Sequence, residues 1–175
     1  MSALSMSQAS IPAFEQMLAS LLKVLEKGEA YATARKIDPS VLLSTRLFPD
    51  MFALTRQVQI TCDFAKNTAG RLAGVELPKF ADEEKTFEEL KARIAKTLDF
   101  IHSLDTKAID ASAHRDIAFK LGPRDISLRG DVYLLQFALP NFYFHHSMTY
   151  AILRHCGVEI GKMDYMGKVP GFPTF

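Results

Sequence analysis

Three of the chain's five histidines lie in one apolar segment near the C-terminus, 141–156, which reads NFYFHHSMTYAILRHC. Within it Asn141, His145 and Thr149 follow one another at intervals of four residues, so their side chains form a row on one face of a helix. This spacing is typical of two metal ligands on a helix. It also suits a general base at His145, with Asn141 positioning a substrate or a water molecule. The structural alternative is a buried histidine that is hydrogen-bonded to a neighbouring side chain.

A second polar group lies in the segment 50–73. Arg56, Gln57 and Gln59 are suited to bind the carboxylate or amide of a small ligand, and an exposed polar face is the alternative. Asp63 shares a stripe with Arg56, Gln59 and Lys66, so we interpret it as a carboxylate that faces solvent or a partner and pairs with Arg56 or Lys66. We therefore include Arg56 and Gln59, but not Asp63, in the candidate ligand pocket.

Cys62 faces the interior in the same segment and also belongs to the candidate pocket. Paired with His145 it would form a thiolate site, which requires a lowered pKa of the thiol. The alternative is a buried cysteine that acts as a small hydrophobic residue. The candidate ligand pocket thus comprises Asn141, His145, Thr149, Arg56, Gln59 and Cys62, and no catalytic residue is assigned among them.

Four long amphipathic segments must position these side chains. The predicted helices span residues 10–35, 50–73, 82–104 and 130–155. Ser10 and Asp50 are suitable N-caps, and Pro12 suits the first turn of the first helix. Gly74 and Gly157 are typical of positions just after a helix. We expect a long crossover between the first and second helices.

The remaining segments complete the predicted fold. Residues 115–128 alternate in hydrophobicity on either side of Gly122-Pro123, which predicts a small β-hairpin. Pro140 lies inside the last helix and should kink it. The tail from Gly161, rich in Gly and Pro, is expected to lie along the surface. The fold class is therefore mainly α, a four-helix bundle with a small β-hairpin before the last helix.

Length and composition bound the class of protein. With 175 residues, 48% of them hydrophobic, the chain is predicted to form one helical-bundle domain over residues 1–175. A formal net charge of +1, with scattered Lys and Arg, argues against nucleic acid as a partner. No apolar run approaches the roughly 18 residues needed to cross a membrane. The start lacks a signal-peptide pattern, and Cys62 and Cys156 show neither metal nor disulfide spacing, so we predict a cytoplasmic protein.

The last predicted helix is apolar on two faces. A bundle buries only one such face, so the second should line an internal pocket or pack against another copy of the chain. We therefore predict a homodimer that binds a small-molecule ligand.

The sequence RHCG at 154–157 closes the last helix in a way that resembles the DinB/YfiT-like superfamily. These are four-helix bundles, many of which hold a metal on three histidines. The resemblance implies a pair of histidine ligands that ends at His145, and this chain has Asn141 in the first position. It implies a third ligand from the second helix, but no histidine lies between residues 1 and 101. His145 is the only residue that matches the ligand pattern, so the metal site is degenerate, with zinc or nickel the only cofactor class left open.

A further resemblance covers nearly the whole chain. The stretches that carry it are SIPAF at 10–14, PDMFALTRQVQ at 49–59, RLAGVE at 71–76, ALPNFYFH at 138–145 and AILRHCGVEIGK at 151–162. By these stretches the chain resembles a bacterial family of unknown function within the same superfamily. The resemblance implies the bundle fold and brings no established activity with it.

Two functions from different classes follow. The first is a dimeric bundle protein with an internal small-molecule pocket and a degenerate metal site. The alternative is a metal-dependent hydrolase or thiol transferase that acts on a small molecule through His145.

Overall fold

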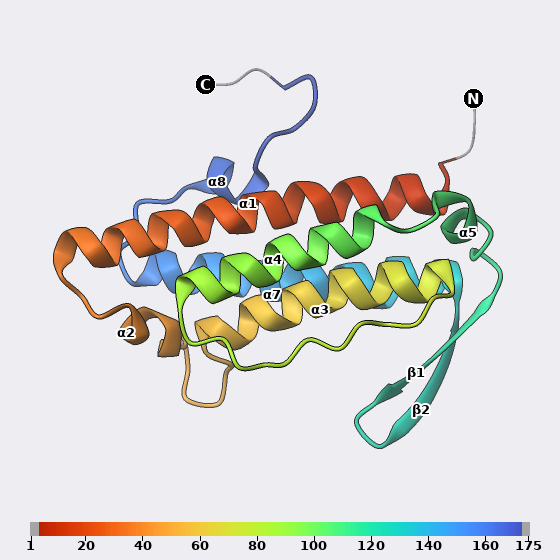
Figure 1. The fold of residues 1–175 in the computed structure, drawn as a ribbon, viewed down its shortest axis with the longest axis horizontal. Coiled ribbons are helices and arrows are strands. Elements are labelled where there is room, and N and C mark those ends of the chain that lie inside the picture. The colour runs from red at the N-terminus through yellow and green to blue at the C-terminus, as the bar shows by residue number, and fades with distance from the viewer. Residues whose placement is uncertain (1–3, 173–175) are drawn as a thin grey trace.

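The computed structural model describes residues 4–172 and contains four long helices (Figure 1). They are α1 (Met6–Arg35), α3 (Leu54–Ala73), α4 (Phe87–His102) and α7 (Leu139–His155). α1 packs against α4 and α7, and α3 packs against the same two helices, so the four surround one core. α1 and α7 run in one direction, and α3 and α4 run in the opposite direction. The predicted mainly α-helical fold is confirmed.

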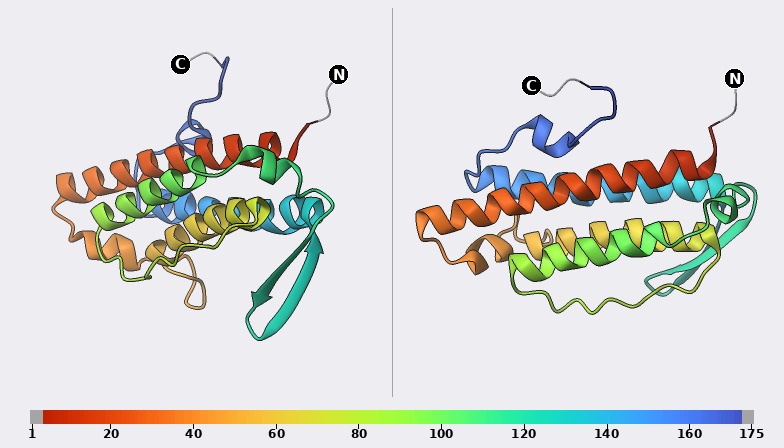
Figure 2. Two further views of the ribbon diagram at one scale, coloured as in Figure 1. Left: turned by 45° about the vertical axis from the view of Figure 1, so that its right-hand side comes forward. Right: turned by 45° about the horizontal axis from the view of Figure 1, so that its top comes forward.

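The parallel course of α3 and α4 requires a connection that runs back along the bundle. Residues 74–86 form this connection without regular secondary structure (Figures 1 and 2). α1 and α3 are antiparallel, so α2 (Pro39–Ser44) joins their adjacent ends. The long crossover therefore lies between the second and third long helices, and the prediction that placed it between the first and second was wrong.

The hairpin predicted before the last helix is present. β1 (Asp116–Leu121) pairs antiparallel with β2 (Arg124–Arg129), and Ile117 stands opposite Leu128. Gly122 adopts a φ of 57° in the turn, a conformation that glycine takes without steric cost. Figure 2 shows the hairpin projecting from one end of the bundle.

The first long helix begins a turn earlier than predicted. Ser5, not Ser10, is the N-cap of α1: its Oγ accepts from the Gln8 amide at 3.3 Å. The Gln8 side chain in turn accepts from the Ser5 amide at 3.1 Å, which completes a capping box. Ser10 and Pro12 consequently lie inside the helix.

The second and third long helices begin later than predicted. α3 starts at Leu54, because Asp50 lies in the turn that precedes it. α4 starts at Phe87, because Thr86 is its N-cap: Thr86 Oγ1 accepts from the Glu89 amide at 3.1 Å. The Glu89 carboxylate accepts from the Thr86 amide at 3.0 Å, so this end too carries a capping box.

The last long helix is not regular over its predicted length. It begins as α6 (Gly130–Val132), continues as a π-helical turn, η1 (Tyr133–Ala138), and becomes α7 at Leu139. Pro140 is the second residue of α7 and has no amide hydrogen to donate. One amide hydrogen bond is therefore missing where the π-helical pairing, five residues apart, gives way to the α-helical pairing of α7. The irregularity expected at Pro140 therefore takes the form of a π-helical turn just before it.

The core follows the predicted apolar stripes. The stripe of α3 is fully buried at Leu54, Val58, Cys62, Ala65, Ala69 and Leu72. Met51, which continues the same spacing toward the N-terminus, precedes the helix and is half-buried. The tail does not stay irregular: it forms α8 (Lys162–Met166), which packs on α1. α5 (Thr106–Asp110) completes the helices and lies between α4 and the hairpin. Over residues 4–172, no helix has the length and apolar character required to span a membrane.

Candidate functional site

His145 on α7 is held by an amide from α3. Its Nδ1 lies 2.7 Å from Oε1 of Gln57, whose side chain is buried. The other end of this amide is also fixed, because its Nε2 donates to the carbonyl of Phe52 at 3.2 Å. The amide oxygen can only accept, so Nδ1 of His145 carries the proton. The lone pair of the neutral ring therefore lies on Nε2.

Nε2 of His145 is reachable from the surface. It makes no hydrogen bond within residues 4–172, and it is not among the buried polar atoms that lack a partner. Burial lowers the pKa of the imidazole from 6.5 to about 4, and the charge of Arg56 contributes to this shift. The ring stacks on Phe64 with centroids 5.9 Å apart and meets the edge of Phe144 at 5.2 Å. His145 thus presents a neutral hydrogen-bond acceptor between two aromatic side chains.

The polar row on α7 is present, but the side chains of Asn141 and Thr149 donate hydrogen bonds to backbone carbonyls one turn earlier in the same helical segment. The Asn141 amide donates to the carbonyl of Phe137 at 2.7 Å. The Thr149 hydroxyl donates to the carbonyl of His145 at 3.2 Å. Because these groups are satisfied locally, Asn141, His145 and Thr149 do not converge on one point.

The residues around His145 do not fit a zinc or nickel site. In the part of the chain that the structure describes, no group of three His, Cys, Asp or Glu side chains is close enough to hold a metal ion. The position that faces His145 from α3 is Gln57, and Asn141 stands where the superfamily pattern has histidine. Carboxamides are poor ligands for these metals. The donor set is one imidazole flanked by amides, and we derive no metal chemistry from it.

Cys62 does not join His145. Its side chain is fully buried, and burial raises the pKa of the thiol to about 12. The thiol is therefore protonated at neutral pH and unsuited to act as a nucleophile. Its hydrogen-bond partner is Thr97 on α4, not His145 on α7. Cys62 is a core residue, as the structural alternative proposed.

Arg56 and Gln59 belong to a separate ion-pair network, which we call the Arg93 cluster. Its members are Arg56, Gln59, Asp63, Lys66, Asp82, Glu84 and Arg93. Arg93 is its centre: its side chain is 2% exposed, yet its guanidinium nitrogens lie 3.0 Å from Asp63, 3.0 Å from Asp82 and 2.9 Å from Glu84. The three carboxylates of the cluster, Asp63, Asp82 and Glu84, balance its three cations, Arg93, Arg56 and Lys66.

The Arg93 cluster fastens the crossover 74–86 to the bundle. Arg93 donates to the carbonyl of Ala81 at 3.1 Å, and Lys66 donates to the carbonyl of Pro78 at 3.0 Å. Arg56 pairs with Asp82 at 2.5 Å, and Gln59 donates to Glu84 at 2.8 Å. These contacts involve only the chain's own groups, so they give the polar stripe of α3 a structural role.

Asp63 pairs with Lys66 at 3.2 Å and with Arg93 at 3.0 Å. The partner Lys66 was among those considered from the sequence, whereas Arg93 was not. Arg93 lies in the α4 stripe beside Leu90 and Ile94, and a charged residue inside an apolar stripe is the signal that would have identified it. Its partners Asp82 and Glu84 lie on the crossover, and the sequence does not indicate that this segment folds back onto α4.

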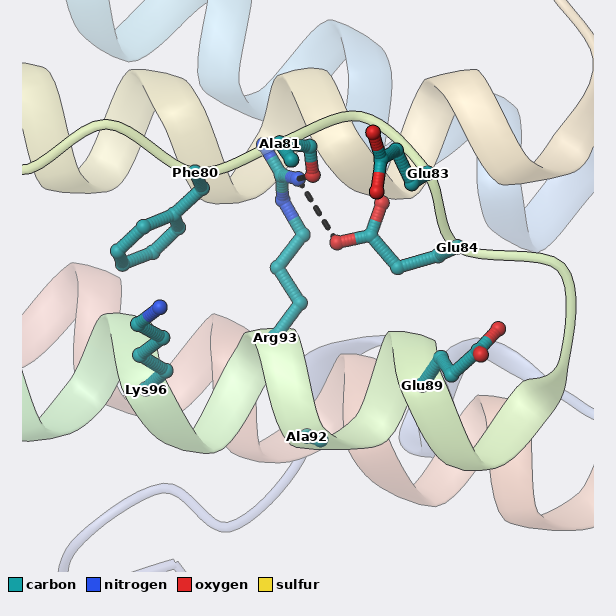
Figure 3. A pocket seen from close by; sticks show the side chains of 8 residues that line it. All are labelled: Phe80, Ala81, Glu83, Glu84, Glu89, Ala92, Arg93 and Lys96. Atoms are coloured by element: carbon teal, nitrogen blue, oxygen red, sulfur yellow. Dashed lines mark hydrogen bonds and ion pairs between the residues drawn. The ribbon is translucent and has the colours of Figure 1, made fainter.

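A cavity of about 350 Å³ lies between the crossover and α4, beside the Arg93 cluster (Figure 3). Its lining is Phe80, Ala81, Glu83, Glu84, Glu89, Ala92, Arg93 and Lys96. A smaller cavity of about 150 Å³, between the hairpin and α3, is lined in part by Phe64, Arg71 and Phe119. Neither cavity includes Asn141, His145 or Thr149. The candidate pocket therefore separates into the surface site at His145 and the Arg93 cluster.

A second histidine, His146, is buried on the α1 side of α7. Its Nε2 lies 3.0 Å from the carbonyl of Met17 and 3.1 Å from Oγ of Ser20. Its Nδ1 is buried with no partner among the described residues. Burial lowers the pKa of this ring too, from 6.5 to about 4. His146 is a core residue, with the ring of Tyr165 from α8 placed edge-on against it.

Comparison with known proteins identifies a matching family and a similar solved structure. The sequence matches the family model described as Domain of unknown function (DUF1993) over residues 6–166. The structure is similar to the crystal structure of a DinB family member protein from Shewanella denitrificans, with a TM-score of 0.86 and 39% sequence identity. That similarity covers 95% of this chain and 94% of the Shewanella chain. No curated protein matches the sequence.

Proposed function

The chain belongs to the DUF1993 family and has a DinB-like fold, and on this premise we propose that it binds a small molecule at His145 without a metal. The observation that supports this proposal is the contact of His145 Nδ1 with Gln57 at 2.7 Å. That contact fixes which nitrogen of the ring is protonated and leaves Nε2 as an acceptor. A ligand with an apolar body and one hydroxyl or N–H group would match Nε2 and the rings of Phe64 and Phe144.

We also propose that the protein is a homodimer that buries this site. Two large apolar side chains beside His145 are strongly exposed: Phe52 (52%) and Phe144 (52%). Phe144 touches the His145 ring, and the carbonyl of Phe52 holds the Gln57 amide. A second copy packed over these side chains would remove them from water and enclose Nε2. This arrangement would form an internal pocket beside His145.

The alternative function is hydrolysis or thiol transfer on a small molecule through His145. The fixed tautomer favours a general base, because Nε2 is the nitrogen free to take a proton. The pKa of about 4 counts against it, since a general base is most effective when its pKa lies near the working pH. The metal-dependent form also lacks ligands. Binding is therefore the function that the geometry supports better.

Elemental analysis of untagged protein tests the absence of a metal from this site. We expect less than stoichiometric zinc and nickel both in the wild type and in His145→Ala, with His155→Ala as a control on an exposed histidine of the same helix. Stoichiometric metal that is lost only in His145→Ala would overturn the proposal. Native mass spectrometry of the same samples tests ligand binding directly. A small molecule retained by the wild type and by His155→Ala, but lost in His145→Ala, is the expected result.

Light scattering tests the dimer. We expect the mass of two chains for the wild type and of one chain for Phe144→Glu. Leu121→Glu is the matched control, because Leu121 is equally exposed (52%) but lies at the tip of the hairpin. A monomeric wild type, or equal effects of the two substitutions, would contradict the proposed interface.

Two further features belong to this proposal. We place the protein in the cytoplasm, an assignment supported by Cys62 and Cys156, which are both free thiols. We also treat residues 1–175 as one helical-bundle domain, which is supported by the core shared among the four long helices.

A further inference from the structure

We propose a second binding site, independent of His145, in the cavity between the crossover 74–86 and α4. Its ligand would be a small zwitterion: a molecule with an ammonium group at one end, a carboxylate at the other and a short aliphatic stretch between them. The cavity has a volume of about 350 Å³, which lies in the range of small-molecule sites.

The walls of this cavity are polarised. Figure 3 shows Phe80 and Lys96 on one side of Arg93, and Glu83, Glu84 and Glu89 on the other. The side chain of Arg93 stands between the two sides, and Ala92 adds an apolar surface on α4. A ligand lying along α4 would therefore meet a cationic side first and an anionic side at its other end.

Some of the charged side chains that line the cavity already have a partner within the protein, and others have none. Glu84 is paired with Arg93 at 2.9 Å, and Glu89 accepts from the backbone amides of Lys85 and Thr86. Glu83 has neither an ion pair nor a hydrogen bond with any residue in 4–172. One carboxylate on the anionic side is thus free to receive an ammonium group.

On the cationic side, Lys96 forms no ion pair within the described chain. Its Nζ lies 4.5 Å from the centroid of the Phe80 ring, which orients the ammonium group beside the cavity. Arg93 adds an unused donor: its Nε is buried and has no acceptor among residues 4–172. A ligand carboxylate placed between these two residues would pair with Lys96 and give the Arg93 Nε–H an acceptor. An unsatisfied buried donor is costly, so such a ligand would remove a penalty that the protein otherwise carries.

The probe is a series of linear ω-amino acids of increasing chain length, titrated into the full-length protein and followed by amide chemical shifts in NMR. We expect saturable shifts confined to residues 80–96, with an optimum at one chain length. The corresponding alkylamines and alkanoic acids each lack one charge and should bind about fivefold or more weakly. Salt should weaken binding of the amino acid, because the charges that hold it are partly exposed.

Three variants in the cavity and one control outside it separate this site from adsorption on the surface. Lys96→Met and Glu83→Gln alter exposed side chains, so both should fold, and each should weaken binding by about fivefold. Ala92→Phe should fill the cavity and abolish the shifts. Lys107→Met, an exposed lysine on α5 outside the cavity, should bind as the wild type does. The proposal is overturned if no member of the series gives saturable shifts at residues 80–96, or if Lys96→Met and Lys107→Met behave alike.

Discussion

Nδ1 of His145 and Oε1 of Gln57 lie 2.7 Å apart across the interface of α7 and α3. This single contact determines what the imidazole of His145 can bind. It orders the ring, assigns the proton to Nδ1 and occupies the place on α3 from which a further metal ligand would have to come.

Replacing the Gln57 amide by a carboxylate should charge the histidine. In Gln57→Glu the pKa of His145 should rise from about 4 by about one to three, because an opposite charge within hydrogen-bond distance favours the protonated ring. A titration followed by imidazole NMR shifts measures this change. Gln136→Glu, an exposed glutamine of the π-helical turn, should leave the pKa near that of the wild type. Equal pKa values in both variants would show that Gln57 does not control the ring.

His146 should make stability depend on acid pH. Its pKa is 6.5 in an unfolded chain and about 4 in the folded one, so the unfolded state binds the proton more readily. The stabilisation is therefore complete above pH 6.5 and is lost as pH falls toward 4, a total of about 3 kcal/mol. Urea unfolding at a series of pH values measures the slope.

His146→Gln should remove that part of the slope, since glutamine does not titrate but retains a donor for the Met17 carbonyl. The wild type should lose about 3 kcal/mol more than this variant between pH 7 and pH 4. His155→Gln, on the exposed last turn of α7, serves as the control and should follow the wild type. Parallel curves for the wild type and His146→Gln would refute the role of His146.

Removing the central charge of the Arg93 cluster should destabilise the fold strongly. Arg93→Met leaves Asp63, Asp82 and Glu84 with one cation fewer and frees the Ala81 carbonyl. Breaking a buried ionic network in this way costs about 3–5 kcal/mol. Lys96→Met, on the same helix but exposed, should cost less than about 1 kcal/mol. Chemical denaturation compares the two, and similar losses would mean that the cluster contributes little.

Gly130 should tolerate no side chain. A Cβ built there would lie 2.1 Å from the Ser112 carbonyl oxygen, so the backbone would have to move. We expect Gly130→Ala to lower the free energy of unfolding by about 2–3 kcal/mol. Gly161→Ala is the control, since a Cβ at that position meets no atom within 4 Å. Equal melting temperatures for the two variants would show that the close approach at Gly130 relaxes freely.

Much of the fold was predictable from the sequence, because its apolar residues recur with helical period. The apolar stripe of α3 is buried from Leu54 to Leu72, as expected of an amphipathic helix, and Gly122 turns the hairpin. The helix starts were harder to predict. The N-caps of α1 and α4 are Ser5 and Thr86, and each belongs to a capping box, in which two residues must bond to each other. A single favourable residue type does not reveal that reciprocity.

The candidate site was predictable only in part. The sequence by itself determined that Asn141, His145 and Thr149 share a helix face, because a spacing of four residues fixes that geometry whatever surrounds it. It also determined that Cys62 is buried, since Cys62 lies within an apolar stripe.

Only the tertiary structure decided which groups meet. The packing of α3 on α7 brings Gln57, 88 residues away along the chain, to His145. The course of the crossover brings Asp82 and Glu84 to Arg93. The polar stripe of α3 therefore holds the crossover against the bundle. Hydrogen bonds and ion pairs act over a few ångströms, and the period of a helix carries no information about which distant segment will lie within that range.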